Sequence, residues 1–97
     1  MEAYKIILKR SAMADLDALR KYGATQIADA MERQLQHDPT KESKSRIKRL
    51  RGISNPDYRL RVGDYRVFYV VDEDARRVDV LRVMHKDQMP YYQELKR

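Results

Sequence analysis

The stretch that decides the fold spans residues 58–69 and reads YRLRVGDYRVFY. Apolar and basic side chains alternate on both sides of Gly63-Asp64, a pattern typical of two antiparallel strands joined by a two-residue turn. Glycine in the first turn position favours a type II′ turn. Such a turn predicts the strand register, in which Val62 pairs with Tyr65, Arg61 with Arg66, Leu60 with Val67, and Arg59 with Phe68.

This register divides the hairpin into two faces, because neighbouring side chains of a strand point to opposite sides. We expect the apolar face to pack against helices; it comprises Tyr58, Leu60, Val62, Tyr65, Val67 and Tyr69. The other face carries Arg59, Arg61 and Arg66 and is expected to stay open. Like charges directly opposite one another, such as Arg61 and Arg66, destabilise a sheet. An anionic ligand bound between the arginines would explain why this face carries them. In the alternative, the turn is longer, or the arginines pair with Asp57, Asp64 or Asp87.

Two helices are expected before the hairpin, packed as an antiparallel pair. Ser11 is a candidate N-cap for the first, over residues 12–22, with Gly23 as its stop and a core face of Met13, Leu16 and Leu19. Thr25 can cap the second, which Pro39 prevents from continuing. Its core face recurs every four residues, at Ile27, Met31 and Leu35.

The remaining segments complete one domain over residues 1–97. A β-branched and aromatic run at residues 4–9 predicts an opening strand. Residues 38–56 are polar and basic, and we interpret them as a connector with room for one short strand. A second hairpin turns through residues 73–77 into a strand over 78–84, and the tail has helical character at residues 93–96.

Composition excludes several classes of protein. The 97 residues contain no cysteine, which excludes a disulfide scaffold, a thiolate nucleophile and a cysteine-ligated zinc site. The longest apolar run, residues 67–71, is too short for a membrane helix, so we expect a soluble, cytoplasmic protein. No phosphate-binding glycine loop, serine nucleophile motif or metal-ligand spacing occurs, so an NTPase and a metal-dependent nuclease are not expected.

The net charge of +6 is concentrated in residues 44–66. This stretch contains two acidic residues and eight basic ones, namely Lys44, Arg46, Lys48, Arg49, Arg51, Arg59, Arg61 and Arg66. A cationic cluster on a small basic domain indicates a site for a polyanion, and nucleic acid is the commonest one. The alternative is an ordinary solvated surface.

Candidate proton-transfer groups follow the last strand. His85, next to Lys86, would stand beside the arginine face, where a group of near-neutral pKa could act on a bound phosphate. Tyr91 and Tyr92 could anchor the tail, stack on a base or transfer a proton. RNA cleavage needs no metal, since the substrate's 2′-OH attacks the phosphate while the enzyme supplies cations and moves two protons.

Three stretches of the chain resemble the RelE/ParE toxin superfamily, in particular its RelE-like branch: LRG at residues 50–52, the hairpin at 58–69, and VLRVMHK at 80–86. The preceding strand and helices match the order in that superfamily, so the resemblance covers essentially the whole chain. It implies an α+β fold, in which a small twisted antiparallel β-sheet packs against an N-terminal helical hairpin and a short C-terminal helical segment follows. It further implies the toxin of a type II toxin–antitoxin pair, which cleaves messenger RNA in the ribosomal A site without metal or other cofactor and leaves a cyclic phosphate.

The resemblance also implies roles for individual residues. Arg59, Arg61, Arg66 and Lys86 would bind phosphate and stabilise charge, and His85 or Tyr91 would transfer protons. Further RNA or phosphate contacts are expected from Lys48, Arg49, Arg51, Arg82 and Tyr92. The chain departs from the family pattern at Met84, where glycine is common, and the variable spacing to the terminal tyrosine leaves Tyr91 and Tyr92 in competition.

The expected partners are an antitoxin with an acidic, disordered tail, the 30S A site of the ribosome, and messenger RNA; no membrane is expected. Two alternatives remain open. A toxin of the ParE branch would share this fold but inhibit DNA gyrase. A non-catalytic RNA- or ribosome-binding module would need the arginine face without a proton-transfer group.

Overall fold

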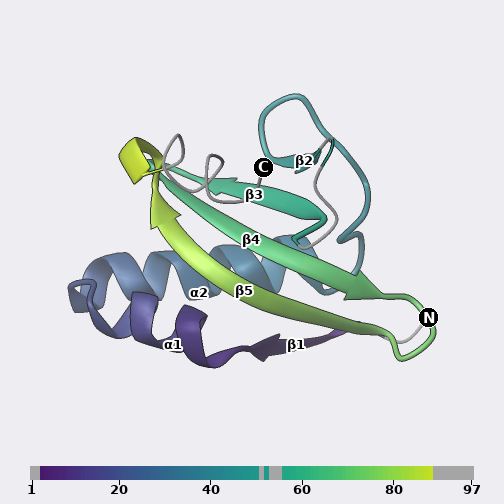
Figure 1. Cartoon of the computed structure of the whole chain (residues 1–97), viewed down its shortest axis with the longest axis horizontal. Coiled ribbons are helices and arrows are strands. Elements are labelled where there is room, and N and C mark those ends of the chain that lie inside the picture. Colours follow the sequence, from purple (N-terminus) through teal and green to yellow (C-terminus); the bar gives the residue numbers. More distant parts are fainter. Residues whose placement is uncertain (1–2, 51, 53–55, 89–97) are drawn as a thin grey trace.

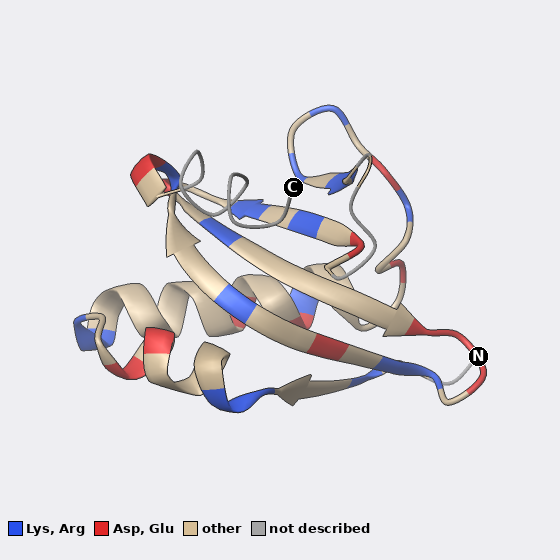
Figure 2. Cartoon of the chain, viewed as in Figure 1, with Lys and Arg blue, Asp and Glu red and all other residues tan. Residues whose placement is uncertain are grey.

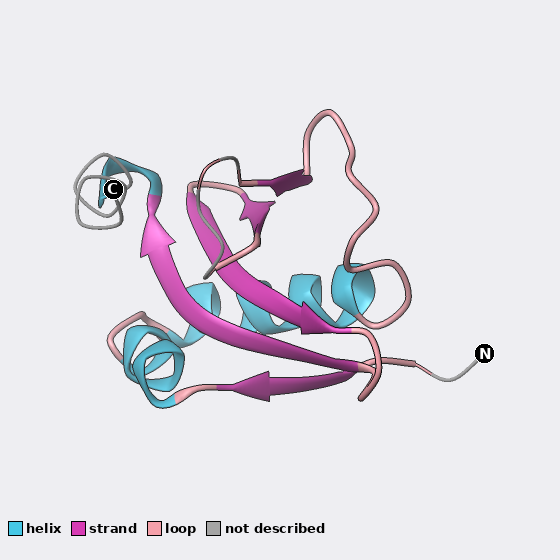
Figure 3. Ribbon diagram, turned by 45° about the vertical axis from the view of Figure 1, so that its right-hand side comes forward, coloured by secondary structure: helices cyan, strands magenta, loops and turns pink. Residues whose placement is uncertain are grey.

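Two helices lie on one face of a five-stranded sheet in the computed structural model, which describes residues 3–50, 52 and 56–88 (Figure 1). The strand order is β1-β5-β4-β3-β2, and a turned view shows the twist of the sheet (Figure 3). The elements are β1 (Lys5–Leu8), α1 (Arg10–Asp17), α2 (Lys21–Leu35), β2 (Ile47–Arg49), β3 (Tyr58–Val62), β4 (Tyr65–Asp72), β5 (Arg77–His85) and a 3₁₀ turn, η1 (Lys86–Gln88). The α+β prediction is confirmed, whereas the C-terminal helical segment lies outside the described residues.

The hairpin of β3 and β4 has the predicted register. All four expected pairs occur, and Tyr58 pairs with Tyr69 beyond them. Gly63 has a φ of +57°, while Arg76 is the only non-glycine residue of the described part with a positive φ. Asp64 therefore has a negative φ, and a positive angle at the first turn position alone is the signature of a type II′ turn.

The first strand makes the sheet mixed rather than wholly antiparallel. β1 pairs with β5 in parallel, from Lys5 beside Arg77 to Leu8 beside Val80, whereas the other three strand pairings are antiparallel. A parallel pair needs a long crossover, and both helices and three strands separate β1 from β5. The sequence pattern could not show this, because alternation has the same period in both kinds of pairing.

The helix boundaries differ from the predicted ones. α1 begins after Lys9 rather than Ser11, and α2 begins after Arg20 and contains both Gly23 and Thr25. Figure 1 nevertheless shows the chain reversing direction between the helices, as predicted. The corner between the helices falls at residues 18–20, where Leu19 packs against the core. The sequence did not predict this position because no glycine or proline marks it. Gly23 lies inside α2 rather than ending a helix, and a Cβ there would meet open space, so the position does not require glycine.

The main core lies between the helices and the sheet. The predicted stripe of Ile27, Met31 and Leu35 on α2 is buried, whereas Met13 is 53% exposed and Ala12 takes the inner position on α1. The rings of Tyr58 and Tyr69 stack at 5.6 Å between centroids. The hydroxyl of Tyr69 donates to the carbonyl of Pro39 at 2.6 Å, and burial raises the pKa of this tyrosine.

A β-bulge in β5 changes which side chains face the core. Phe68 of β4 pairs with Arg82, but the next residue, Tyr69, pairs with Val80, so Leu81 is an extra residue. Val80 before the bulge and Val83 after it both belong to the core. An extra residue reverses the alternation of faces, so the end of β5 has the opposite orientation from an unbroken strand.

α1 supplies a carboxylate beside this bulge. β1 ends at Leu8, and α1 then contacts the second half of β5. Oδ2 of Asp15 accepts hydrogen bonds from the backbone N–H of Val83 at 2.8 Å and from Nε of Arg82 at 2.7 Å, while Oδ1 accepts from Nη2 of Arg82 at 3.1 Å. Asp15 thereby joins the first helix to the bulged strand.

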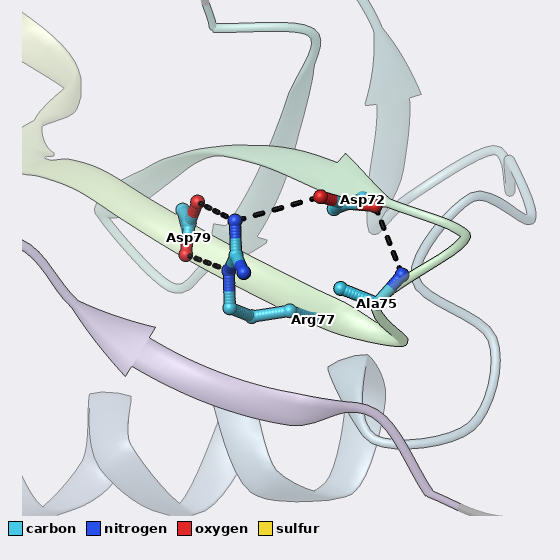
Figure 4. A network of polar contacts seen from close by, with 4 residues as sticks. All are labelled: Asp72, Ala75, Arg77 and Asp79. Carbon is cyan, nitrogen blue, oxygen red and sulfur yellow. Dashed lines mark hydrogen bonds and ion pairs between the residues drawn. The ribbon is translucent and has the colours of Figure 1, made fainter.

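A second carboxylate network closes the β4–β5 turn, at the opposite end of β4 from Arg66 (Figure 4). Nε of Arg77 donates to Asp79 at 3.0 Å, and Nη2 lies 3.5 Å from a carboxylate oxygen of Asp72. Asp72 also accepts the N–H of Ala75 at 3.0 Å. The hydrogen bond that Arg77 donates to Asp79 raises the pKa of Arg77, so this cation is well satisfied.

Replacing Asp15 should weaken the fold. Its side chain is 17% exposed and holds three charge-assisted hydrogen bonds, so we expect Asp15→Ala to lower the free energy of unfolding by about 2 kcal/mol. Urea denaturation measures this change. The control is Asp17→Ala, which removes an exposed carboxylate at the end of the same helix, where a negative charge opposes the helix dipole. A loss no larger than that of the control would contradict the bridging role of Asp15.

Candidate functional site

Three arginines share the face of the sheet that is opposite the helices. Arg61 pairs directly with Arg66, and Arg59 lies two residues before Arg61 on β3; we call these three residues the arginine cluster. Arg61 is exposed, and the other two are half-buried. Figure 2 shows the blue bands of β2, β3 and the beginning of β4 close together. The predicted grouping of these residues is therefore present.

The face is less open than predicted. Phe68, which follows Arg66 by two residues on β4, is only 1% exposed, and it forms a second apolar cluster with Met84. Leu50, just after β2, packs against this pair. The predicted pairing of Arg59 with Phe68 puts this ring on the arginine face, where Leu50 packs against it. The arginine cluster therefore lies beside the small apolar cluster of Phe68, Met84 and Leu50.

The arginine cluster has no carboxylate partner among the described residues. Asp64 pairs with Lys86 at 3.6 Å and Asp87 with His85 at 3.4 Å, and no ion pair of the described part joins these or Asp57 to the cluster. The alternative in which these aspartates neutralise the arginines is therefore wrong for the described residues. Arg77 and Arg82, in contrast, each bind a carboxylate.

The electrostatics of the cluster follow from this arrangement. Burial lowers the pKa of Arg59, and the charges of Arg66 and Arg61 lower it further. Burial and the charge of Arg61 likewise lower the pKa of Arg66, while Asp64 acts in the opposite direction. Arginine stays protonated near neutral pH despite such effects, so the cluster holds three like charges in one place. An anion between them would relieve the repulsion.

Hydrogen bonds fix one of these arginines more firmly than the others. Nη1 of Arg66 donates to the carbonyl oxygens of Gly63 and Tyr65, both at 2.9 Å, so the turn itself holds this guanidinium. The Nε atoms of Arg59 and Arg66 are buried, and neither has an acceptor among the described residues. Buried donors are normally satisfied, so these two N–H groups lack the acceptor that such groups usually have.

The other predicted phosphate contacts are divided between the two faces. Lys48 pairs with Arg59 and therefore shares the face of the cluster. Arg49 pairs with Tyr58 on the helix side, where its Nη1 donates to the Tyr58 hydroxyl at 3.1 Å. The guanidinium of Arg82 binds Asp15. Arg51, Tyr91 and Tyr92 lie outside the described residues.

His85 does not lie on the face of the arginine cluster, contrary to the expectation from sequence. It pairs with Tyr65, and the two rings meet edge to face at 5.3 Å between centroids. The bulge at Leu81 is the reason, since it places Met84 rather than His85 on the side of Arg66. Nδ1 of His85 accepts the backbone N–H of Asp87 at 3.2 Å, so a neutral ring carries its proton on Nε2.

Lys86 connects the end of β5 to the hairpin turn. Its backbone N–H donates to the carbonyl of Asp64 at 2.7 Å, and its ammonium lies 3.6 Å from the Asp64 carboxylate. Because Arg66 binds the same turn through Gly63, Lys86 and Arg66 are held by neighbouring residues. The structure thus brings Lys86 to the turn that carries the cluster.

Sequence reasoning missed Arg33 on α2 as a candidate, and it counted Arg46 as a basic residue without giving it a role. Both line a cavity of about 400 Å³ together with Arg61. The available signal was the spacing of Gln26, Arg33 and Gln34, which places polar side chains on one stripe of the helix. Within the described residues, no group of three or more histidine and acidic side chains could hold a metal ion, and no helix is long and apolar enough to cross a membrane.

Comparison with solved structures finds the same fold in several toxins. A chain of the toxin–antitoxin complex RelBE2 from Mycobacterium tuberculosis is 25% identical, with a TM-score of 0.74 over 86% of this chain and 98% of that one. A chain of the archaeal RelE–RelB complex from Pyrococcus horikoshii is also 25% identical, with a TM-score of 0.69 over 86% and 94%. A mutant of E. coli toxin RelE in the free state shares the fold at 24% identity, with a TM-score of 0.69 over 95% and 93%.

Comparison by sequence identifies the family. No curated protein matches the chain. The model of the family described as "ParE toxin of type II toxin-antitoxin system, parDE" matches residues 6–90, which include both helices and all the strands except the first residue of β1. With that match and the RelE-like fold, the chain belongs to the ParE toxin family of type II toxin–antitoxin systems, within the RelE/ParE superfamily.

Proposed function

We propose that this toxin is an endoribonuclease that cleaves messenger RNA in the A site of the ribosome, without a metal ion. The observation that carries the proposal is the arginine cluster, whose three cations share one face of the sheet and have no carboxylate partner among the described residues. Such a cluster suits a phosphate that gains negative charge during reaction. Ribosomes are cytoplasmic, so the toxin would act in the cytoplasm.

The proposed reaction is a transesterification within the RNA. The 2′-oxygen of one ribose attacks the adjacent phosphorus, and the bond from phosphorus to the 5′-oxygen of the next nucleotide breaks. A base takes the proton from the 2′-OH, and an acid gives a proton to the leaving 5′-oxygen. The products are a 2′,3′-cyclic phosphate and a 5′-hydroxyl. The cluster would stabilise the additional charge on the pentacovalent phosphorus.

The contacts of each basic residue suggest its role. Arg66 is oriented in advance by the turn carbonyls, which suits a group that must meet a developing charge without rearranging. Arg61 is exposed and can close on the phosphate, while Arg59 offers a buried Nε that has no acceptor among the described residues. Lys48 on the same face and Lys86 at the turn would hold the neighbouring backbone.

The proton-transfer group is either His85 or one of the tyrosines Tyr91 and Tyr92. In the observed geometry the rings of His85 and Tyr65 meet edge to face. Nδ1 of His85 accepts the backbone N–H of Asp87, so the neutral His85 ring carries its proton on Nε2. Because His85 pairs with Tyr65, on the opposite face of the sheet from the arginine cluster, this position favours a tyrosine as the group beside the phosphate. Neighbouring cations lower the pKa of a phenol and so help it to act as a base.

A second candidate function is inhibition of DNA gyrase, and one specific observation favours it. The family model that matches residues 6–90 is that of ParE toxins. A toxin of that kind needs no proton-transfer group, and the position of His85 away from the cluster agrees with this. A non-catalytic RNA- or ribosome-binding module would also need the arginine cluster alone. The two experiments below separate these functions.

The proposed antitoxin is a protein with an acidic, disordered tail that folds on the toxin. The solved relatives from M. tuberculosis and P. horikoshii are complexes of toxin with antitoxin. A chain of net charge +6 with an unneutralised arginine cluster attracts an acidic polypeptide, which would cover the cations when bound.

Induction of the toxin should produce messenger RNA cuts that follow the reading frame. We expect mapping of RNA 5′ ends to show cleavage at a fixed position within codons. On programmed ribosomes, the same cuts should persist in the presence of a chelator, because no step requires a metal. Intact messages together with inhibited supercoiling by purified gyrase would instead establish the ParE-type function.

Replacing Arg61 should separate activity from stability. Its side chain is exposed and faces a like charge, so Arg61→Ala should change the free energy of unfolding by no more than about 0.5 kcal/mol. Loss of one cation at the reacting phosphate should slow single-turnover cleavage by about 10²–10³-fold. Arg10→Ala removes an exposed arginine of α1 and is the control for net charge. An unchanged cleavage rate would remove Arg61 from the active site.

Antitoxin binding should weaken as salt rises. Ions screen the attraction between an acidic tail and the arginine cluster, since the Debye length falls from about 10 Å at 0.1 M salt to about 3 Å at 1 M. Titration calorimetry at several ionic strengths measures the dissociation constant. An affinity that stays constant over this range would show that electrostatic attraction contributes little to the complex.

A further inference from the structure

A cavity of about 400 Å³ lies between α2 and the end of β3. Its polar lining consists of Arg33, Arg46, Arg61, Gln26, Gln34 and Ser45. The residues that line it include three cations, two amides and one hydroxyl, but no carboxylate. The two neighbouring cavities along α2 differ from this one, because acidic side chains are among the residues that line them.

The short second strand explains why this cavity exists. β2 pairs with β3 only from Tyr58 to Leu60, so Arg61 and Val62 form an unpaired edge. The chain before β2 crosses this edge, where the N–H of Arg61 donates to the carbonyl of Arg46 at 2.7 Å. That hydrogen bond holds Arg46 beside the end of β3. A backbone hydrogen bond therefore fixes the wall of the cavity that Arg46 and Arg61 form.

α2 supplies the opposite wall. Gln26, Ala30, Arg33 and Gln34 have the i, i+4, i+7, i+8 spacing of one helix face, and all four line the cavity. Nε of Arg33 donates a long hydrogen bond, 3.4 Å, to the carbonyl of Asp29 on its own helix. No ion pair of the described part includes Arg33, Arg46 or Arg61, so none of the three basic residues that line the cavity has a carboxylate partner there.

Arg61 connects this cavity to the arginine cluster. It lines the cavity, and it also pairs with Arg66 on the other side of the sheet edge. A ligand with a charge on each repeating unit could therefore pass from the cluster over the edge of β3 and continue between α2 and Arg46. The backbone of a single-stranded nucleic acid has this regular charge.

The lining favours RNA over an acidic polypeptide as the occupant. Amphipathic polypeptide tails bind through apolar anchors as well as charges, and the cavity offers only Ala30 and Val62 as apolar side chains. Amides and a hydroxyl suit phosphate and ribose oxygens, as the non-base contacts of nucleic-acid-binding proteins show. The apolar surface expected for a folded tail is absent from the residues that line this cavity.

We propose that Arg33, Arg46 and Arg61 form a flanking-phosphate site, which holds the backbone of the RNA strand next to the phosphate bound by the arginine cluster. The inference rests on the proposed RNA substrate and extends it to a longer binding track. Because the contacts would be to the backbone, they should strengthen binding of longer strands without regard to base sequence.

The test uses fluorescence anisotropy with labelled 2′-O-methyl oligonucleotides of 3 and 9 nucleotides, which lack the attacking hydroxyl and cannot be cleaved. The proteins are the full chain and its variants Arg33→Ala, Arg46→Ala and the control Arg10→Ala. Arg10 is exposed and lies on α1, away from the residues that line the cavity. A 20-residue polyglutamate peptide is the probe for the polypeptide alternative.

We expect Arg33→Ala and Arg46→Ala each to weaken binding of the 9-mer at least about threefold and to reduce the slope of log affinity against log salt by about 0.7, the value for one lost phosphate contact on a single strand. Binding of the 3-mer should change no more than in Arg10→Ala. Equal effects in all three variants, or a loss of affinity for polyglutamate alone, would overturn the proposal.

The same variants distinguish this inference from the proposed function. If Arg33 and Arg46 contribute to 9-mer binding while programmed ribosomes leave messages intact, the RNA track stands and the nuclease assignment fails. If cleavage depends on Arg61 while the 9-mer binds Arg33→Ala and Arg46→Ala as tightly as the control, the nuclease assignment stands and the flanking-phosphate site is wrong.

Discussion

The pairing of Arg61 with Arg66 across β3 and β4 is the constraint on which the rest of the site depends. It follows from the two-residue turn at Gly63, whose positive φ sets the register of the whole hairpin. A shift of one residue would turn the arginines toward the helices and the core side chains toward solvent. The register is therefore held by burial on one face, including Leu60, Val67 and Tyr69, although it opposes two like charges on the other. The opposition of these charges has a cost, and an anion bound by the cluster, as proposed, would offset it.

The bulge at Leu81 decides which residues join the cluster. In an unbroken β5, the alternation that buries Val80 would place His85 on the side of Arg66. The extra residue instead buries Met84 there and turns His85 toward Tyr65. Asp15 stabilises this geometry by binding the N–H of Val83 at the bulge. A carboxylate on the first helix thus helps to decide which side chains of β5 lie on the opposite face of the sheet.

The arginines of this small domain differ in whether they bind a carboxylate. Arg77 and Arg82 bind carboxylates of the β4–β5 turn and of α1, and these contacts connect elements of the fold. The arginine cluster and the two cations beyond the edge of β3 have no such partner among the described residues. Membership of the ParE toxin family establishes a toxin of a type II toxin–antitoxin system. The arrangement of the unneutralised cations is the feature that points to a polyanion.

The sequence by itself determined the hairpin, its register and the grouping of the three arginines, because a period of two and a glycine turn are local signals that burial reinforces. It also predicted the core stripe of α2, since a spacing of four residues defines one helix face. It could not determine the corner at Leu19, the parallel pairing of β1 or the bulge at Leu81, because each depends on packing between segments far apart in the chain. For the same reason, the sequence could not show on which face of the sheet His85 lies, or that Arg33 and Arg46 line the same cavity. Only the tertiary structure decided these, because side-chain direction after a bulge and contact across a sheet edge are set by neighbours that the local sequence does not contain.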